Sequence, residues 1–314
     1  MLPRIADSLS FLYLDKVRIV QDDTGVCARI DVNHERTDLV YLPTAALSCL
    51  LLGPGVSITT RALATLARHG TSVICTGSTG VRAYAAILPD SLTTHWLERQ
   101  VTAWADLNQR LSTATRMYDL RFSPDQAPSN ATLDQLRGLE GQRMKSLYKI
   151  QAEQHGIGRF RRNYHPDQWD TQDPVNLALS AANTCLYGIV HAAILALGCS
   201  PALGFVHTGK QHAFVYDVAD LYKATTTIPI AFSLHQSPQP EQDARRSFRE
   251  ELRLLRLLPR IVRDIQSLLA PPSDIGDGED GDDSPESQDV RIVHLWDPKA
   301  GTLQAGVNYA PDGD

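Results

Sequence analysis

The sequence predicts an α+β protein with a β-rich N-terminal domain, a mainly α-helical second domain and an acidic, disordered C-terminal tail. Short apolar runs separated by turn residues fill positions 9–87. From about residue 92 the apolar residues recur with the helical period instead. Residues 271–289, PPSDIGDGEDGDDSPESQD, have a composition that cannot form a packed core. We therefore expect domains at 1–90 and 91–270 and a tail at 271–314.

The first domain contains several segments with strand-like patterns. These are LSFLYLDKVRIV, VCARIDV and LVYLP, followed by the pair TSVICTG and VRAYAAI. The segment ITTRALATLARHG, between LVYLP and that pair, has helical spacing of its apolar residues. The domain is therefore expected to be a small β-rich unit with one or two helices.

Helical periodicity dominates the second domain, in LTTHWLERQVTAWADLNQRLSTATRMYDLRF and TLDQLRGLEGQRMKSLYKIQAEQHG. The run LALSAANTCLYGIVHAAILALG, 177–198, is long enough to span a membrane. It carries Ser180, Asn183 and His191 in its middle and lacks basic flanks, which favours a buried helix and no membrane association. In the tail, VRIVHLWDPKAGTLQAGVNY resembles two short strands, which are too small to fold alone and should dock on this protein or on a partner.

Composition limits the class of protein. Five cysteines without CxxC spacing argue against a disulfide framework or a cysteine zinc site. The N-terminal residues lack the basic start and apolar core of a signal peptide, which favours a cytoplasmic protein. The net charge is −6, but the last 44 residues hold eleven acidic and two basic residues. The preceding 270 residues therefore carry 28 basic against 25 acidic residues, a weakly basic body that is compatible with a polyanionic partner.

A carboxylate interrupts the apolar face of the helix predicted from Thr132 to about Gln154. At about 100° per residue, Glu140 falls within the stripe formed by Leu133, Leu136, Met144 and Leu147. A carboxylate in such a place needs a cation or strong donors. It could face a cleft, or it could simply pair with Arg137 or Arg143 at the edge of the stripe.

A second group of polar residues lies in GFVHTGKQHAFVYDVADLYK, 204–223. Asp217 and Asp220 follow the strand-like AFVY, and a helix that begins near Asp217 would place them on one face. Either could instead be a helix cap. His207 could be a satisfied core or turn residue. Taken together with Glu140, however, these side chains offer an oxygen-rich set with one imidazole, which suits Mg²⁺ or Mn²⁺ better than zinc.

Three segments carry a resemblance to a known family: LRGLEGQRMKSLY, SAANTCLYGIVHAAILALGCSPALGFVHTGK and FVYDVADLYK. They resemble the signature blocks of the CRISPR-associated integrase that inserts new spacers into CRISPR arrays, and the Cascade-linked type I-E branch is the most similar. The resemblance extends over residues 5–270 and is strongest over 130–225. It implies a β-rich N-terminal domain and a helical catalytic domain. It also implies Glu140, His207 and Asp220 as ligands of Mg²⁺ or Mn²⁺, with Asp217 as a further catalytic residue.

The reaction implied by the resemblance is metal-dependent transesterification. A 3′ hydroxyl of captured double-stranded DNA with 3′ single-stranded ends would attack a phosphodiester of CRISPR repeat DNA. The implied assembly is a homodimer that forms a heterocomplex with a small second CRISPR acquisition protein. Residues 290–309 are hypothesised to dock on that partner.

Basic and aromatic residues outside the ligand set are candidates for DNA contact. In RFRRNYHPDQW, 159–169, arginines alternate with aromatic residues, although a solvated loop with a buried aromatic explains the pattern equally well. The resemblance adds positions near the active site and a basic residue of the β domain. The expected DNA contacts are Arg82, Arg159, Arg161, Arg162, Tyr187, Lys210, Tyr216 and Lys223. Tyr13, in the first strand, could brace the end of a duplex or could be an ordinary strand residue.

Two other functions remain open at this point. A stand-alone metal-dependent nuclease acting on branched DNA in repair would use the same chemistry and would need no partner. A catalytically inert DNA-binding scaffold would retain the fold without using the metal ligands, and the intact set of four site residues argues against it.

Overall fold

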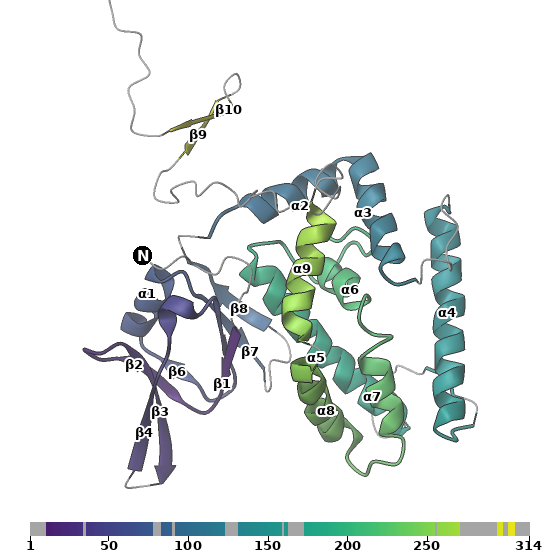
Figure 1. Ribbon diagram of the computed structural model, residues 1–314, viewed down its shortest axis with the longest axis horizontal. Coiled ribbons are helices and arrows are strands. Elements are labelled where there is room, and N and C mark those ends of the chain that lie inside the picture. Colours follow the sequence, from purple (N-terminus) through teal and green to yellow (C-terminus); the bar gives the residue numbers. More distant parts are fainter. Residues whose placement is uncertain are drawn as a thin grey trace, which may run out of the picture.

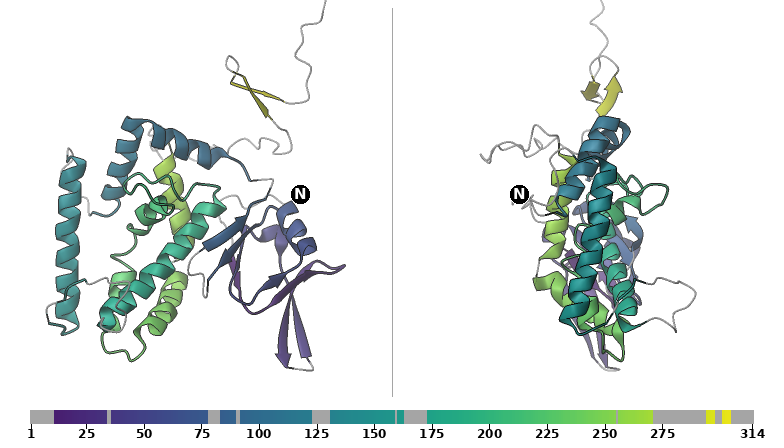
Figure 2. Two further views of the ribbon diagram at one scale, coloured as in Figure 1. Left: turned by 180° about the vertical axis from the view of Figure 1, so that it is seen from behind. Right: turned by 90° about the vertical axis from the view of Figure 1, so that its right-hand side faces the viewer.

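Strands occupy the first part of the chain and helices most of the remainder (Figure 1), which confirms the predicted α+β class. The computed structural model describes residues 11–33, 36–77, 83–89, 92–122, 131–158, 160–162, 173–254, 256–270, 294–297 and 301–304. The predicted disorder of the acidic tail concerns residues outside these ranges. The two parts of the molecule lie side by side, as Figures 1 and 2 show from opposite directions.

Two four-stranded sheets build the N-terminal region. The first has the order β1 (Phe11–Leu14), β5 (Cys49–Leu52), β7 (Ser72–Thr76) and β8 (Ala83–Ile87), with β8 antiparallel to its neighbour and the others parallel. The second has the order β4 (Arg36–Tyr41), β3 (Val26–Asn33), β2 (Arg18–Gln21) and β6 (Ser57–Ile58). A short 3-10 helix, η1 (Thr44–Ala46), precedes β5, and helix α1 (Thr60–Arg68) confirms the helix predicted in this region.

Strand β5 lies between two apolar cores because its side chains alternate between the faces of the sheet. Leu50 and Leu52 enter the core shared with the second sheet and α1, whereas Cys49 and Leu51 pack toward Ala192 and Ala196 of helix α5 (Pro174–Ala196). Both faces are therefore covered, which explains the continuous apolar run CLLL. Helix α5 joins the two parts of the molecule through this contact.

The helical region is built around α5, which packs against α6 (Ala213–Ala219), α7 (Thr227–Ser233), α8 (Pro240–Leu254) and α9 (Leu257–Leu269). The most apolar stretch of α5 is 72% buried inside the protein, which confirms the predicted buried helix. Helices α2 (His95–Ala105), α3 (Leu107–Asp119) and α4 (Leu133–Gln154) complete the region. Thr132 and Gln135 form a capping box that begins α4 at the predicted position.

The structure corrects two expectations and confirms a third. Residues of the segment AFVY lie in helix α6 rather than in a strand, because Phe214 and Val215 are buried against the helical core and not along a sheet. Strand β5 is an addition to the segments predicted to be strands. In the tail, β9 (His294–Asp297) pairs with β10 (Gly301–Gln304) in antiparallel fashion, as the two-strand pattern predicts. The domain boundaries at 90 and 270 stay predictions.

Candidate functional site

Asp217 organises the loop that carries His207. Its carboxylate is fully buried within α6 and accepts the backbone N–H groups of Phe205 at 2.6 Å, Val206 at 3.0 Å and His207 at 2.8 Å. Such a carboxylate would be costly to bury without donors, and here it has several. The three hydrogen bonds from consecutive N–H groups hold the loop around Asp217 and so fix the position of the His207 backbone.

The same carboxylate also orients the imidazole of His207. Nδ1 of the ring donates to Oδ1 of Asp217 at 2.7 Å, and this hydrogen bond raises the pKa of His207, although burial opposes the shift. The charges of Asp217 and Asp220 reinforce the upward shift. Because Nδ1 is held in this way, Nε2 is the nitrogen left for a ligand. Asp217 therefore acts through His207, a role that differs from the co-facing pair of aspartates expected from the spacing.

Residues of α2 and α3 that were not predicted from the sequence hold the start of the same loop. Gln100 is fully buried; its Nε2 donates to the carbonyl of Ser200 at 2.8 Å, and its Oε1 accepts the N–H of Ser200 at 2.8 Å. Trp104 Nε1 and Arg110 Nη2 both donate to the carbonyl of Gly204, at 3.1 and 3.2 Å. The one signal in the sequence was a polar Gln100 on the same helical face as Ala103.

Asp220 ends α6 and lies between two cations. Lys223 Nζ is 2.6 Å from its Oδ1, and Arg121 Nη1 is 3.7 Å from its Oδ2. Burial lowers the pKa of Lys223, but Asp220 and Tyr187 outweigh burial and the net shift is upward. The ammonium group also lies 5.0 Å from the centre of the Tyr187 ring, which makes a T-shaped contact with the Tyr216 ring. Lys223 is therefore held as a cation at the carboxylate.

Glu140 has a cation of its own. Arg143 binds it in bidentate fashion, with Nε to Oε2 at 2.8 Å and Nη2 to Oε1 at 3.0 Å. The Arg143 guanidinium lies 5.8 Å from the centre of the Phe122 ring. This arrangement matches the alternative in which Glu140 pairs at the edge of its stripe. Arg137, the other suggested partner, binds Asp134 instead.

Two consecutive residues that follow α3, Arg121 and Phe122, contact Asp220 and the Arg143 partner of Glu140, respectively. Arg121 contacts Asp220 and also donates to the carbonyl of Asp217 at 3.3 Å, while Phe122 contacts Arg143. Within the part of the chain that the structure describes, no three His, Cys, Asp or Glu side chains converge closely enough to hold a metal ion. The structure thus gives each predicted carboxylate ligand a protein cation, and it does not gather Glu140, His207 and Asp220 into a closed cluster.

The donor chemistry of these side chains nonetheless fits a hard divalent cation. Glu140 and Asp220 supply carboxylate oxygens, and His207 presents one ring nitrogen fixed by its partner. The positive charge that Arg143, Arg121 and Lys223 provide around the carboxylates is the kind of compensation that Mg²⁺ or Mn²⁺ would supply. The three side chains therefore match Mg²⁺ or Mn²⁺ in the type of their donor atoms and in their charge.

The other residues predicted to contact DNA differ in their surroundings. Arg82 and Arg159 lie outside the described residues. Arg162 bonds to the Oδ1 of Asn176 at 2.8 Å and to Ser180 Oγ at 3.2 Å, so that it anchors its segment to the start of α5. Arg161 and Lys210 are exposed. Tyr187 and Tyr216 line the surroundings of His207 and Lys223, and Tyr13 donates to Asp15 at 3.3 Å.

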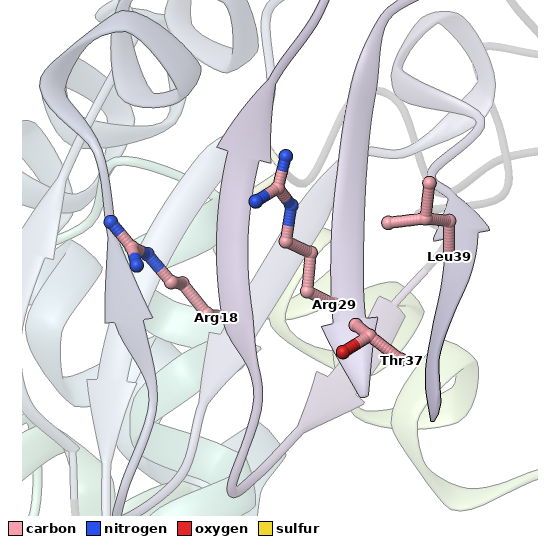
Figure 3. Close-up of a pocket in the computed structure, with 4 residues that line it drawn as sticks. All are labelled: Arg18, Arg29, Thr37 and Leu39. Atoms are coloured by element: carbon pink, nitrogen blue, oxygen red, sulfur yellow. The ribbon is translucent and has the colours of Figure 1, made fainter. Parts of the chain in front are cut away.

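The second sheet carries a basic groove that was not predicted from the sequence. It has a volume of about 360 Å³ and is lined by Arg18, Arg29, Thr37 and Leu39 (Figure 3). Arg18 and Arg29 are direct cross-strand partners, and Figure 3 shows both guanidinium groups on one side of the sheet. Like charges placed opposite each other are unfavourable unless an anion or solvent separates them. The groove lies on other elements than those that position His207.

Comparisons with known proteins place this fold. The family described as CRISPR associated protein Cas1 matches residues 116–257. The CRISPR-associated endonuclease Cas1 of Clostridium sp. strain SY8519 is 36% identical over the full length of both chains. The CRISPR-associated endonuclease Cas1 2 of Thermus thermophilus is 39% identical over 99% of this chain and 93% of its own. A crystal structure of a TtCas1–DNA complex superposes with a TM-score of 0.75 at 40% identity, covering 85% of this chain and 99% of that one.

The fold and these matches define a CRISPR-associated protein. Within that class, the chain belongs to the Cas1 family.

Proposed function

We propose that this protein is a metal-dependent DNA integrase and endonuclease of CRISPR adaptation. The observation that carries the proposal is the arrangement of His207, whose ring is fixed by Asp217 so that Nε2 is available, with Asp220 at the end of the same helix α6 that carries Asp217. The names of the relatives, which are CRISPR-associated endonucleases, and the DNA complex of a similar structure support it.

Glu140, His207 and Asp220 would hold Mg²⁺ or Mn²⁺, which when bound polarises a phosphodiester and stabilises the charge that develops during attack. Asp217 keeps the His207 ring in the tautomer that frees Nε2. Lys223 and Arg143 are cations close to these carboxylates and can each contact a phosphate. Tyr187 and Tyr216 support the Lys223 ammonium and the His207 ring.

The proposed reaction exchanges one phosphate ester for another. The 3′ oxygen of the captured DNA forms a new bond to phosphorus at the repeat border, the bond from that phosphorus to the repeat strand breaks, and the departing oxygen is protonated. No external energy source is needed because the number of ester bonds is unchanged. Hydrolysis follows if water replaces the 3′ hydroxyl, which accounts for nuclease activity.

The finer features of this function are proposals as well. They are a homodimer, a heterocomplex with the small second acquisition protein, action in the cytoplasm and membership of the type I-E branch. Docking of 290–309 on the partner is part of the same proposal, and deletion of 271–314 should then weaken partner binding. For DNA contact by the β domain, the exposed Arg18 and Arg29 add candidates to Arg82.

A strand-transfer assay tests the proposal. Purified protein is mixed with Mn²⁺ or Mg²⁺, a short duplex with free 3′ hydroxyls and a plasmid carrying leader and repeat, with and without the partner protein. Joined product is expected with the partner and should disappear in His207→Ala but persist in His212→Ala, which removes a neighbouring imidazole outside the ligand set. Cleavage of branched DNA without joining would favour the repair nuclease. Absence of any metal-dependent activity would favour the inert scaffold.

A further inference from the structure

Two ion pairs on α4 have the same spacing but very different surroundings. Arg137 and Asp134 are three residues apart and largely exposed, with side chains that keep 54% and 90% of their accessible surface. Arg143 and Glu140 are also three residues apart, but keep only 23% and 16%. The first pair is an ordinary surface pair of small energetic value. The second is largely, but not fully, shielded from solvent.

The Arg143 guanidinium makes more than a simple charge contact. Both carboxylate oxygens of Glu140 receive an N–H group, and the same guanidinium lies beside the Phe122 ring and 3.9 Å from Met144 Sδ. A bidentate arrangement occupies the carboxylate positions that a metal ion would need. Arg143 and a divalent cation therefore compete for Glu140.

Asp220, like Glu140, is neutralised by cations of the protein itself. Lys223 and Arg121 neutralise that carboxylate, and the Arg121 side chain keeps only 3% of its accessible surface, with its Nε hydrogen left without a partner among the described residues. Arg121 is confined by its surroundings, whereas Arg143 and Lys223 each keep 23% of their side-chain accessible surface. Lys223 contacts one oxygen of Asp220, whereas Arg143 covers both oxygens of Glu140. Arg143 is thus the cation that must leave before its carboxylate can take a metal ion, and its side chain is exposed enough to do so.

We propose that Arg143 is an exchangeable counter-ion, which occupies Glu140 in the metal-free protein and moves to a DNA phosphate when the carboxylate takes a divalent cation. The inference rests on the proposed metal site at Glu140. Its consequence is that metal and DNA bind cooperatively, because the metal releases a guanidinium whose fork geometry suits a phosphate. By linkage, DNA raises the affinity for the metal by the same factor as the metal raises the affinity for DNA.

Binding measurements on the full chain test this exchange without relying on catalysis. The Mn²⁺ affinity is obtained from the electron paramagnetic resonance signal of free Mn²⁺, and DNA affinity from the fluorescence anisotropy of a short labelled duplex at constant ionic strength. Gels confirm that the duplex remains intact. Arg143→Gln removes the competing charge, Arg137→Gln is the matched control on the exposed pair of α4, and Arg143→Lys serves if the glutamine variant does not fold.

In the absence of DNA, Arg143→Gln should bind Mn²⁺ about fivefold more tightly than the unmodified protein, as expected from losing a competing interaction of ~1 kcal/mol. The factor by which Mn²⁺ strengthens DNA binding should fall by about the same ratio. Arg143→Lys should change both in the same direction, and Arg137→Gln should change neither. Unchanged or weaker Mn²⁺ binding in the Arg143 variants, or unchanged coupling to DNA, would overturn the exchange.

A third variant separates this inference from the proposed function. Glu140→Gln should lose most of the Mn²⁺ binding. If it binds Mn²⁺ as the unmodified protein does, the proposed metal site is wrong and the exchange is wrong with it. If Glu140→Gln loses Mn²⁺ but Arg143→Gln does not gain it, the metal site stands and the exchange alone is wrong.

Discussion

The carboxylate of Asp217 binds His207 twice, accepting its backbone N–H at 2.8 Å and its ring Nδ1 at 2.7 Å with the same oxygen. One buried side chain thus determines both the path of the loop and the orientation of the imidazole. Because the other oxygen accepts from Phe205 and Val206, Asp217 has donors on both oxygens.

Asp217→Asn should be strongly destabilising. The amide keeps one acceptor oxygen but places an NH₂ group against backbone donors, which leaves buried N–H groups without partners. We expect a loss of about 2–4 kcal/mol in the free energy of unfolding, measured by urea titration. The control is Asp106→Asn at the exposed N-cap of α3, where asparagine caps about as well and the change should be small. Equal effects of the two substitutions would contradict the role given to Asp217.

Gly204→Ala should displace the His207 loop at its first residue. An added Cβ would lie 2.5 Å from the carbonyl oxygen of His207 and 2.8 Å from the backbone of Ala213, and backbone cannot give way as a flexible side chain can. The expected cost is about 2 kcal/mol or more. Gly138→Ala, on α4, is the matched control because a Cβ there meets nothing within 4 Å, and it should gain up to ~1 kcal/mol. Thermal unfolding that ranks the variants in the opposite order would refute this reasoning.

Gln100→Leu tests whether α2 positions the loop. The substitution keeps the approximate volume but strips hydrogen-bond partners from both backbone groups of Ser200 and from the carbonyl of Leu203. The predicted cost is about 2–3 kcal/mol, with faster amide hydrogen exchange over 200–207. Gln109→Leu alters an exposed glutamine on α3 and should change stability by less than ~0.5 kcal/mol. Unaltered exchange in the loop would show that Gln100 does not hold it.

His191 should make stability depend on pH. Burial, with a contribution from nearby His212, lowers its pKa to about 4 from an ordinary value of 6.5. A lowered folded-state pKa means that the unfolded chain binds the proton more readily, so the contribution is complete above about pH 6.5 and is lost as the pH falls toward 4. Because the ring is partly exposed, we expect a loss of about 1 kcal/mol between about pH 7.5 and 5.

The measurement for His191 is a comparison of two slopes. Unfolding free energies of the unmodified protein and of His191→Gln are determined by urea titration between about pH 5 and 7.5. The variant should show a shallower dependence on pH, whatever its absolute stability. Parallel curves would mean that His191 is not the group responsible.

Much of the secondary structure followed from local patterns. Thr132 and Gln135 mark the start of α4, and the long apolar run of α5 predicts a buried helix. Both signals are local because capping and apolar runs involve residues close together in the chain. The prediction of a strand at AFVY was wrong because a short apolar run has no distinct period, and burial against α5 decided that it is helical.

The sequence by itself determined the α+β class, the order of most elements and, through the three signature segments, the family and the four candidate site residues. Only the tertiary structure decided what those residues do to one another. Asp217 serves the His207 loop, and Asp220 contacts Arg121 as well as its near neighbour Lys223. The pairing of Glu140 with Arg143 was one of the local alternatives, and the structure selected it over pairing with Arg137. The physical reason is that burial depends on contacts between segments far apart in the chain. Residues of α2 and those just after α3 contact the His207 loop and α6 across about 100 residues of sequence. No local pattern encodes such contacts.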